Sequence, residues 1–84
     1  MTDQTITIHG ASWCPDAQRS RSLLEDKGVS FLWRDIDGDP SSKSFAKEAN
    51  QGELRIPVIV FPDNSILIEP TNVQLEEKLA EFGL

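Results

Sequence analysis

Residues 5–17 read Thr-Ile-Thr-Ile-His-Gly-Ala-Ser-Trp-Cys-Pro-Asp-Ala, and this stretch decides the fold. Its first five residues are rich in β-branched side chains and alternate in polarity, which is typical of a strand. Gly10 then starts a turn, and Pro15 suits the first position of a helix, where a missing N–H costs nothing. The pattern predicts a strand over 5–9 and a helix from Pro15 to Lys27, which Gly28 ends.

The rest of the chain extends this strand and helix into an α/β fold. A second strand over 29–36 follows the helix, and a helical connection of this length favours a parallel pair of strands. The later segments predict a polar helix over 43–50, a strand over 56–61, a hairpin strand over 66–68 and a last helix. Thr71 and Gln74 form a capping box before that helix. The order β-α-β-α-β-β-α predicts a mixed four-stranded sheet with helices on both faces.

Length, charge and cysteine count limit the class of protein. A chain of 84 residues predicts a single domain, 1–84, with one modest core. There is no apolar run long enough for a membrane span, and the first four residues do not resemble a secretory signal. The net charge of −6 argues against nucleic-acid binding. The single cysteine excludes an internal disulfide and favours the reducing cytoplasm. We therefore expect a cytoplasmic monomer without nucleic-acid or membrane partners.

Cys14 is the first candidate for chemistry. It lies where the first strand passes into the first helix, and the positive end of a helix favours a thiolate. The thiolate is the nucleophile of thiol–disulfide exchange. The alternative is a buried structural cysteine, a common fate of this residue type.

Pro57 is the second candidate. A proline that opens a strand cannot donate to the sheet, and its bond to Ile56 is either trans or cis. In the cis form, the backbone of Ile56 is exposed for strand-like pairing with a peptide-shaped ligand. The sequence alone leaves both forms open.

Taken together, the motifs resemble the glutaredoxin family, which has the thioredoxin fold. They are Trp13-Cys14-Pro15-Asp16, Asp35-Ile36-Asp37, Asn50-x-Gly52-x-x-Arg55-Ile56-Pro57, Phe61-Pro62-Asp63-Asn64 and Pro70-Thr71. Their spacing is especially similar to that of the small actinobacterial mycoredoxins. The resemblance implies a thiol–disulfide oxidoreductase that reduces oxidised or S-thiolated client proteins. Its co-substrate would be a low-molecular-weight thiol, mycothiol or glutathione, with no tightly bound cofactor and no metal.

The resemblance also implies a set of site residues. Cys14 would be catalytic, with a cis Pro57 against its thiol and the backbone of Ile56 paired with the small thiol. N–H groups around Thr71 and Asn72 would hold carboxylates of that ligand. The full set of expected thiol-binding residues is Trp13, Pro15, Asp16, Arg21, Arg55, Ile56, Pro57, Thr71 and Asn72. Arg19 is a further source of positive charge.

Two departures from the family pattern qualify this expectation. Ala17 stands where the family usually has its second, resolving cysteine. Before the last helix, Ile68-Glu69-Pro70-Thr71-Asn72 stands where the family usually has a Gly-Gly-x-Asp-like turn. Ala17 permits a monothiol cycle with a small thiol and excludes an internal dithiol cycle. It is either natural or an engineered replacement in a Cys-Pro-Asp-Cys site. Two other functions stay open: a monothiol iron–sulfur-binding module and a redox-silent thioredoxin-fold binding domain.

Four further features have two interpretations each. Trp13 either shields the thiol and contacts a partner or is a core aromatic. Asp16 is a solvated first-turn acid or a proton-transfer group. His9 is a structural residue at a strand end or the partner of Cys14 in a Cys–His pair. The acids Asp35, Asp37 and Asp39 form a solvated turn or a cation site.

Overall fold

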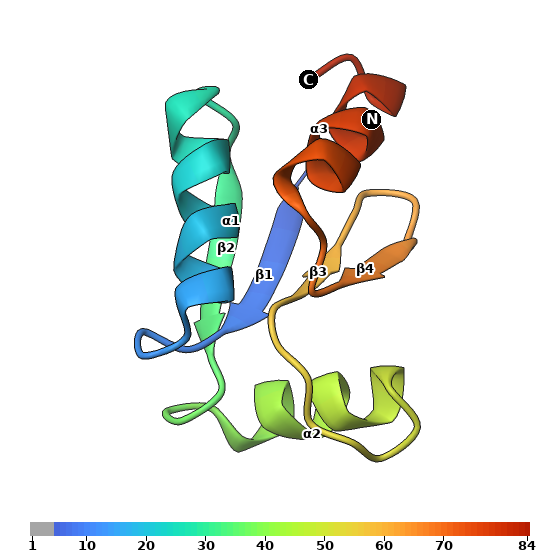
Figure 1. Cartoon of the computed structure of the whole chain (residues 1–84). Helices are drawn as coiled ribbons and strands as arrows, with labels where there is room; N and C mark the ends of the chain where they lie inside the picture. The colour runs from blue at the N-terminus through green and yellow to red at the C-terminus, as the bar shows by residue number, and fades with distance from the viewer. Residues whose placement is uncertain (1–4) are drawn as a thin grey trace.

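The computed structural model describes residues 5–84, which form a four-stranded sheet and three helices (Figure 1). The elements are β1 (Ile6–Gly10), α1 (Pro15–Asp26), β2 (Phe31–Asp35), α2 (Pro40–Ala49), β3 (Val58–Val60), β4 (Ile66–Ile68) and α3 (Asn72–Glu81). The strand order is β2-β1-β3-β4; β1 and β2 are parallel, whereas the other neighbours are antiparallel. This confirms the predicted element order and mixed sheet. The prediction of no secretory signal concerns the first four residues, which lie outside the described range.

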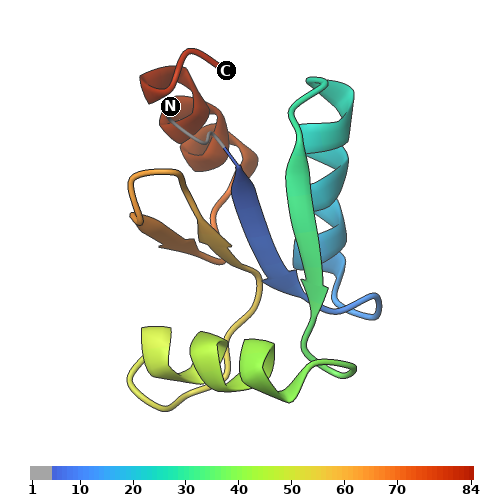
Figure 2. The ribbon, with the colours of Figure 1, turned by 180° about the vertical axis from the view of Figure 1, so that it is seen from behind.

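Helices cover the two faces of the sheet unequally. On one face, α1 and α3 bury a cluster that consists of Ile6, Ile8, Leu24, Ile59, Phe61, Leu75 and Leu79. Each fully buried side chain of this kind stabilises the fold by roughly 1.5–3 kcal/mol. The other face is covered by α2 only at the end of the sheet where β1 and β2 finish (Figure 2). The remainder of that face carries the partly exposed side chains of Thr7 and Val60.

A second, smaller cluster lies at the α2 end of the molecule. It consists of Ala11, Cys14, Ala17, Ile36, Ala46, Ile56 and Val58. The close approach of α1 to β1 at this end depends on Gly10. A Cβ there would lie 2.9 Å from the Cβ of Ala17 and 2.9 Å from the Trp33 ring. The first turn of α1, which begins directly after Cys14, is therefore held tightly against the sheet.

Several element ends differ from the predicted ones. The second helix begins at Pro40 rather than at residue 43, because Asp39 caps it by accepting from the N–H groups of Ser41 and Ser42. The strand β2 is shorter than predicted because β1 offers it only five partners. The strand β3 starts at Val58, after a cis peptide bond between Ile56 and Pro57. The first strand ends at Gly10 and the first helix at Asp26, each one residue from its predicted end.

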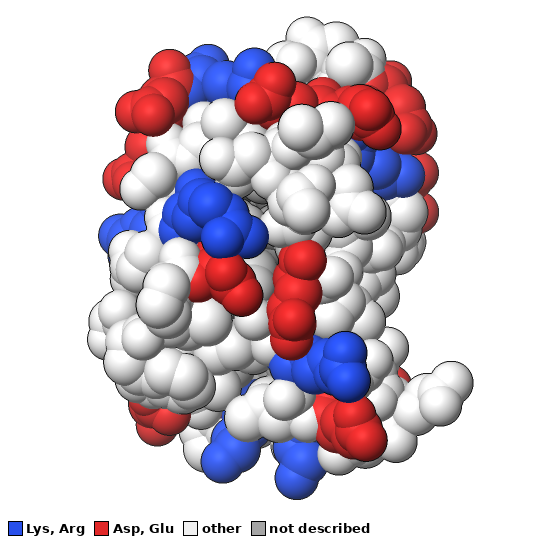
Figure 3. Space-filling view, in the orientation of Figure 1, with Lys and Arg blue, Asp and Glu red and all other residues white. Residues whose placement is uncertain are grey.

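The surface charge is uneven. Acidic side chains gather at the end of the molecule where α1 and α3 finish (Figure 3). Around the beginning of α1 the surface is mostly uncharged. Within residues 5–84, none of the helices combines the length and the apolar character needed to cross a membrane.

Candidate functional site

Cys14 is the N-cap residue of α1. Its backbone is extended, its N–H donates to the carbonyl of Ala11 (3.1 Å), and its own carbonyl accepts from Gln18 N (3.0 Å). Its side chain makes no capping hydrogen bond, and the N–H groups of Asp16 and Ala17 have no acceptor within the described residues. The sulfur thus occupies the place where serine or aspartate side chains cap helices. A thiolate there would gain two unused donors and the positive end of the helix.

The thiol lies against the residue that precedes the cis proline. Cys14 is 8% exposed, and its Sγ donates to the carbonyl oxygen of Ile56 at 3.8 Å. The Ile56–Pro57 bond is cis, the form that the resemblance implies. The carbonyl of Pro57 in turn accepts from Glu69 N (2.9 Å). One continuous set of contacts therefore joins Cys14 to the segment that leads into α3.

Arg19 approaches the same segment from α1. Its Nη2 donates to the carbonyl of Pro70 (3.3 Å), and its Nη1 pairs with Asp16 Oδ1 (2.8 Å). The guanidinium of Arg21 lies 4.6 Å from the centre of the Trp33 ring, which borders Ala17. Arg19 rather than Arg21 contacts the segment before α3, and this contact depends on the position of Pro70, 51 residues away in the sequence.

Thr71 and Asn72 begin α3. The predicted capping box is present: Gln74 N donates to Thr71 Oγ1 (3.1 Å), and Thr71 N donates to Gln74 Oε1 (2.9 Å). The N–H of Thr71 is therefore engaged within the helix and is not available to a ligand. Asn72 differs, since its Oδ1 is buried without a hydrogen-bond partner in the described chain.

Trp13 and Arg55 flank the site on the surface. Trp13 is 63% exposed, and its Nε1 donates to Asp37 Oδ2 at 2.7 Å, so its interpretation as a core aromatic is wrong. Arg55 is exposed and makes a loose ion pair with Glu53 at 3.7 Å. Pro15 occupies the first position of α1, and its side chain is exposed. The site therefore has a buried thiol with an exposed aromatic beside it.

Ala17 is completely buried next to Cys14 in the small cluster at the α2 end. It lies one turn along α1 from Cys14, and Gly10 and the Trp33 ring enclose it from the sheet side. A side chain at this position therefore faces the interior beside the thiol rather than the solvent.

His9 does not take part in the Cys14 site. Its Nδ1 is hydrogen-bonded to Ser42 Oγ (2.6 Å), and its ring stacks on Phe45 with 4.6 Å between centroids. Burial, with a contribution from the charge of Arg34, lowers the pKa of His9. These contacts support the structural interpretation over a Cys–His pair.

The acidic cluster has other partners. Asp37 accepts a hydrogen bond from Trp13 Nε1, and Asp39 caps α2. Asp35 Oδ1 accepts from Asp37 N (2.9 Å). Within residues 5–84, no three His, Cys, Asp or Glu residues are arranged as a metal site. The turn interpretation is therefore the one that the contacts support.

Comparison with known proteins agrees with this geometry. The Glutaredoxin family model matches residues 5–66. A protein of Mycobacterium tuberculosis described as a glutaredoxin is 26% identical over 83 residues, 99% of each chain. Mycoredoxin 1 of Corynebacterium glutamicum is 27% identical over 75 residues, which are 88% of this chain and 91% of that protein.

Solved structures show the same fold. A glutaredoxin from Archaeoglobus fulgidus superposes with a TM-score of 0.71 at 23% identity, covering 88% of this chain and 84% of that one. The glutaredoxin-like NrdH-redoxin from Escherichia coli gives a TM-score of 0.66 at 19% identity, with 86% and 92% covered. The family-model match spans most of the chain and includes Cys14, Ile56 and Pro57. This chain therefore belongs to the glutaredoxin family of thiol–disulfide oxidoreductases.

Proposed function

We propose that the chain reduces mixed disulfides between client proteins and a small thiol by a monothiol cycle, with Cys14 as the nucleophile. The observation that carries the proposal is the position of Cys14. Its sulfur occupies the cap of α1, beside two unused N–H donors and 3.8 Å from the carbonyl of Ile56. Such a cycle requires a supply of reduced small thiol. We further propose that the protein acts in the cytoplasm and as a monomer.

The cycle has two exchange steps. In the first, the Cys14 thiolate attacks the small-thiol sulfur of a protein–S–S–R disulfide, and the client leaves as a thiolate. In the second, another RS⁻ attacks the Cys14–S–S–R bond, which releases RSSR and restores the Cys14 thiolate. In the net reaction one RS⁻ is oxidised to the disulfide level as the client sulfur is reduced to a thiolate, and both R groups leave as RSSR. Ala17 adds no competing thiol to either step.

The polar groups around Cys14 favour an uncharged small thiol such as mycothiol over glutathione, which carries two carboxylates. Two groups that a carboxylate could use are already engaged: Thr71 N with Gln74, and the Arg19 Nη1 with Asp16. Glu69 adds a negative charge where the chain turns towards α3. The unpaired acceptor Asn72 Oδ1 would instead suit an amide or hydroxyl donor.

Client proteins would contact the uncharged surface near the thiol. Trp13, Leu54 and Val73 are large exposed hydrophobic residues, each within two residues of Cys14, Ile56 or Thr71 in sequence. We infer that they form one apolar contact surface beside the thiol, since contiguous exposed apolar patches mark interaction sites. The hydrogen bond to Asp37 fixes the Trp13 ring in its exposed position.

Intact-mass measurement tests the proposal. The protein is incubated with oxidised mycothiol or oxidised glutathione, and Cys14→Ser serves as the control. We expect one adduct, formed faster with oxidised mycothiol, removed by excess reduced thiol and absent from Cys14→Ser. The absence of an adduct with both reagents, together with slow alkylation of Cys14, would leave a redox-silent binding domain. Visible absorbance of the purified protein would instead favour the iron–sulfur alternative.

Ala17→Cys tests the role of position 17. Under mild oxidant, we expect the variant to lose the mass of the two thiol hydrogens as an intramolecular disulfide forms with Cys14. The small-thiol adduct should then be short-lived, because the second cysteine displaces it. A stable adduct on Ala17→Cys would show that residue 17 cannot reach the Cys14 sulfur.

A further inference from the structure

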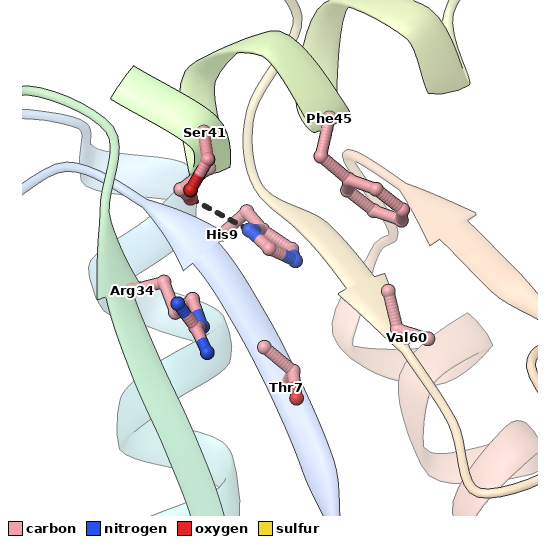
Figure 4. A pocket seen from close by; sticks show the side chains of 7 residues that line it. Thr7, His9, Arg34, Ser41, Phe45 and Val60 are labelled. Atoms are coloured by element: carbon pink, nitrogen blue, oxygen red, sulfur yellow. Dashed lines mark hydrogen bonds between the residues drawn. The ribbon is translucent and has the colours of Figure 1, made fainter. Parts of the chain in front are cut away.

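A hollow of about 340 Å³ lies on the face of the sheet that α2 leaves partly open, away from the Cys14 site (Figure 4). Residues of β1, β2, β3 and α2 line it. Its volume is at the small end of the range for ligand pockets. It lies next to His9, a buried titratable residue that the proposed cycle does not use.

The hydrogen bond between His9 and Ser42 determines what His9 offers to the hollow. Ser42 is 2% exposed, and its hydroxyl has one partner among residues 5–84, the Nδ1 of His9. A hydroxyl that only accepted this bond would leave its own proton buried without an acceptor. Ser42 therefore donates to Nδ1, which places the proton of the neutral imidazole on Nε2.

His9 Nε2 is thus a donor that has no acceptor within the described residues and is open to the hollow. The residue is 7% exposed, it lines the hollow, and its Nε2 makes no hydrogen bond within the described chain. Figure 4 shows the ring between Phe45 and Arg34, with the second nitrogen on the side away from the Nδ1 hydrogen bond. A donor in this position pairs with water in the free protein and is available to an acceptor on a bound molecule.

Arg34 supplies positive charge to the same hollow. Its Nη1 pairs with Asp39 Oδ2 (3.0 Å), while its Nη2 has no partner among the described residues. The carboxylate of Asp39 is occupied by Arg34 and by the first turn of α2, and Asp39 does not line the hollow. Hydrogen bonds from Ser41 and Ser42, with that of Arg34, hold the pKa of Asp39 to about 2.

The remaining walls are largely apolar. Thr7 and Val60 face each other in neighbouring strands, and Phe45 of α2 stands over them. Phe45 stacks on the His9 ring, which leaves an aromatic surface at the entrance. A flat ring can lie on this surface while its polar end reaches His9 and Arg34.

We propose that this hollow is a second ligand site, separate from the thiol site, for a small carboxylate carried on a flat apolar ring. The carboxylate accepts from His9 Nε2–H and from Arg34 Nη2, and the ring packs against Thr7, Val60 and Phe45. The ligand class is that of aromatic carboxylates, which combine one anion with one planar apolar group.

Benzoate is the probe, and the chain's one histidine makes nuclear magnetic resonance of its ring nitrogens the readout. We expect a saturable change of the His9 signals at millimolar benzoate. The His9 titration should also move upward on binding, because a nearby carboxylate favours the imidazolium. The groups that face His9 in the free protein are Arg34, which lowers its pKa, and Asp39, which raises it. Benzyl alcohol, which has the ring without the charge, should leave the titration unchanged.

Arg34→Gln and Lys47→Gln form a matched pair, because each removes one exposed positive charge. Arg34→Gln should weaken benzoate binding by about fivefold or more, as expected for loss of a charge-assisted hydrogen bond. Lys47→Gln, which is outside the hollow, should bind like the wild type. The proposal is overturned if benzoate gives no saturable shift, or if both variants bind it equally well. Neither outcome affects the Cys14 adduct test.

Discussion

At position 10, β1 passes so close to α1 that no side chain fits between them. The Cβ of Ala17 and the ring of Trp33 both lie within 2.9 Å of the place that a Cβ of residue 10 would occupy. This contact sets how deeply the first turn of α1, and with it Cys14, sits in the molecule. The requirement for glycine here is therefore one of space rather than of backbone angle.

Gly10→Ala should lower the free energy of unfolding by about 1–3 kcal/mol, the usual cost of overpacking a core. Gly38→Ala is the matched control, because nothing lies within 4 Å of its would-be Cβ. The control should change stability by about 0.5 kcal/mol or less. Urea unfolding of both variants measures the effect. Equal stability of the two variants would contradict the contact described.

Contacts between residues that are close in sequence could be predicted, whereas contacts between residues that only the fold brings together could not. The turn around Cys14 and the capping box of Thr71 and Gln74 each span a few residues, so local chemistry indicates them. His9 and Ser42 are 33 residues apart, and their pairing depends on how α2 docks on the sheet. The contact of Arg19 with Pro70 joins residues 51 apart, so local sequence does not distinguish Arg19 from Arg21.

At the scale of elements, α3 depends on its beginning. Its N-cap Thr71 and Gln74 satisfy two donors reciprocally, and Leu75 and Leu79 anchor its buried face. The same segment contacts Arg19 through Pro70 and thus borders the site. The strength of the cap therefore affects both the helix and the edge of the site.

Thr71→Ala should cost about 1 kcal/mol of stability, because the N–H of Gln74 loses its acceptor. Val73→Ala, at an exposed position of the same helix, should change stability by about 0.5 kcal/mol or less. Thermal or urea unfolding distinguishes the two variants. A larger loss for Val73→Ala than for Thr71→Ala would refute the importance of the cap.

The contact between β1 and α2 should make stability depend on pH. Burial and Arg34 lower the pKa of His9 from its ordinary value of 6.5, so the unfolded chain takes up this proton first as the pH falls. The His9 contribution is therefore complete above the unfolded value. It declines as the pH falls below about 6.5 and stops changing below the folded pKa.

Urea unfolding of the wild type and of His9→Gln at several pH values between about 5 and 8 tests this prediction. The stability difference between the two proteins should shift against the wild type as the pH falls. A difference that is constant over this range would show that His9 titrates alike in both states.

Element ends were harder to predict than the elements themselves. The helix α2 begins at Pro40 rather than at the predicted residue 43. The capping side chain of Asp39 and a proline at the first helical position outweigh the lack of apolar residues there. The strands are shorter than the apolar runs suggest, because a strand extends only as far as its partners do. The sequence pattern indicates apolar stretches but not the length of the neighbouring strand.

At the scale of the whole molecule, the charge at the end where α1 finishes is unfavourable to the dipole of α1. The net charge is −6, and the last turn of α1 carries Glu25 and Asp26 with no basic residue. Negative charge at a helix C-terminus is unfavourable. Acidic residues of α3 lie at the same end and add repulsion (Figure 3).

Asp26→Lys should stabilise the protein by about 0.5–1 kcal/mol at low salt, because it relieves both the dipole and the repulsion. The gain should shrink at about 0.5 M NaCl, where exposed charges are screened. Asp26→Asn should give a smaller gain, since it removes a charge without adding one. A gain that is equal at both salt concentrations would point to a cause other than charge.

The N-cap of α1 lacks a side-chain hydrogen bond, and this feature couples the redox state of Cys14 to the protection of the first helical amides. The amides of Asp16 and Ala17 lie beside the Cys14 sulfur and have no acceptor within residues 5–84. In the proposed cycle, a thiolate would satisfy these amides and a mixed disulfide would release them again. Their hydrogen-exchange rates would then fall and rise with each half of the cycle. The hydrogen-exchange rates of these two backbone amides would thus report the redox state of Cys14 without a chemical label on the protein.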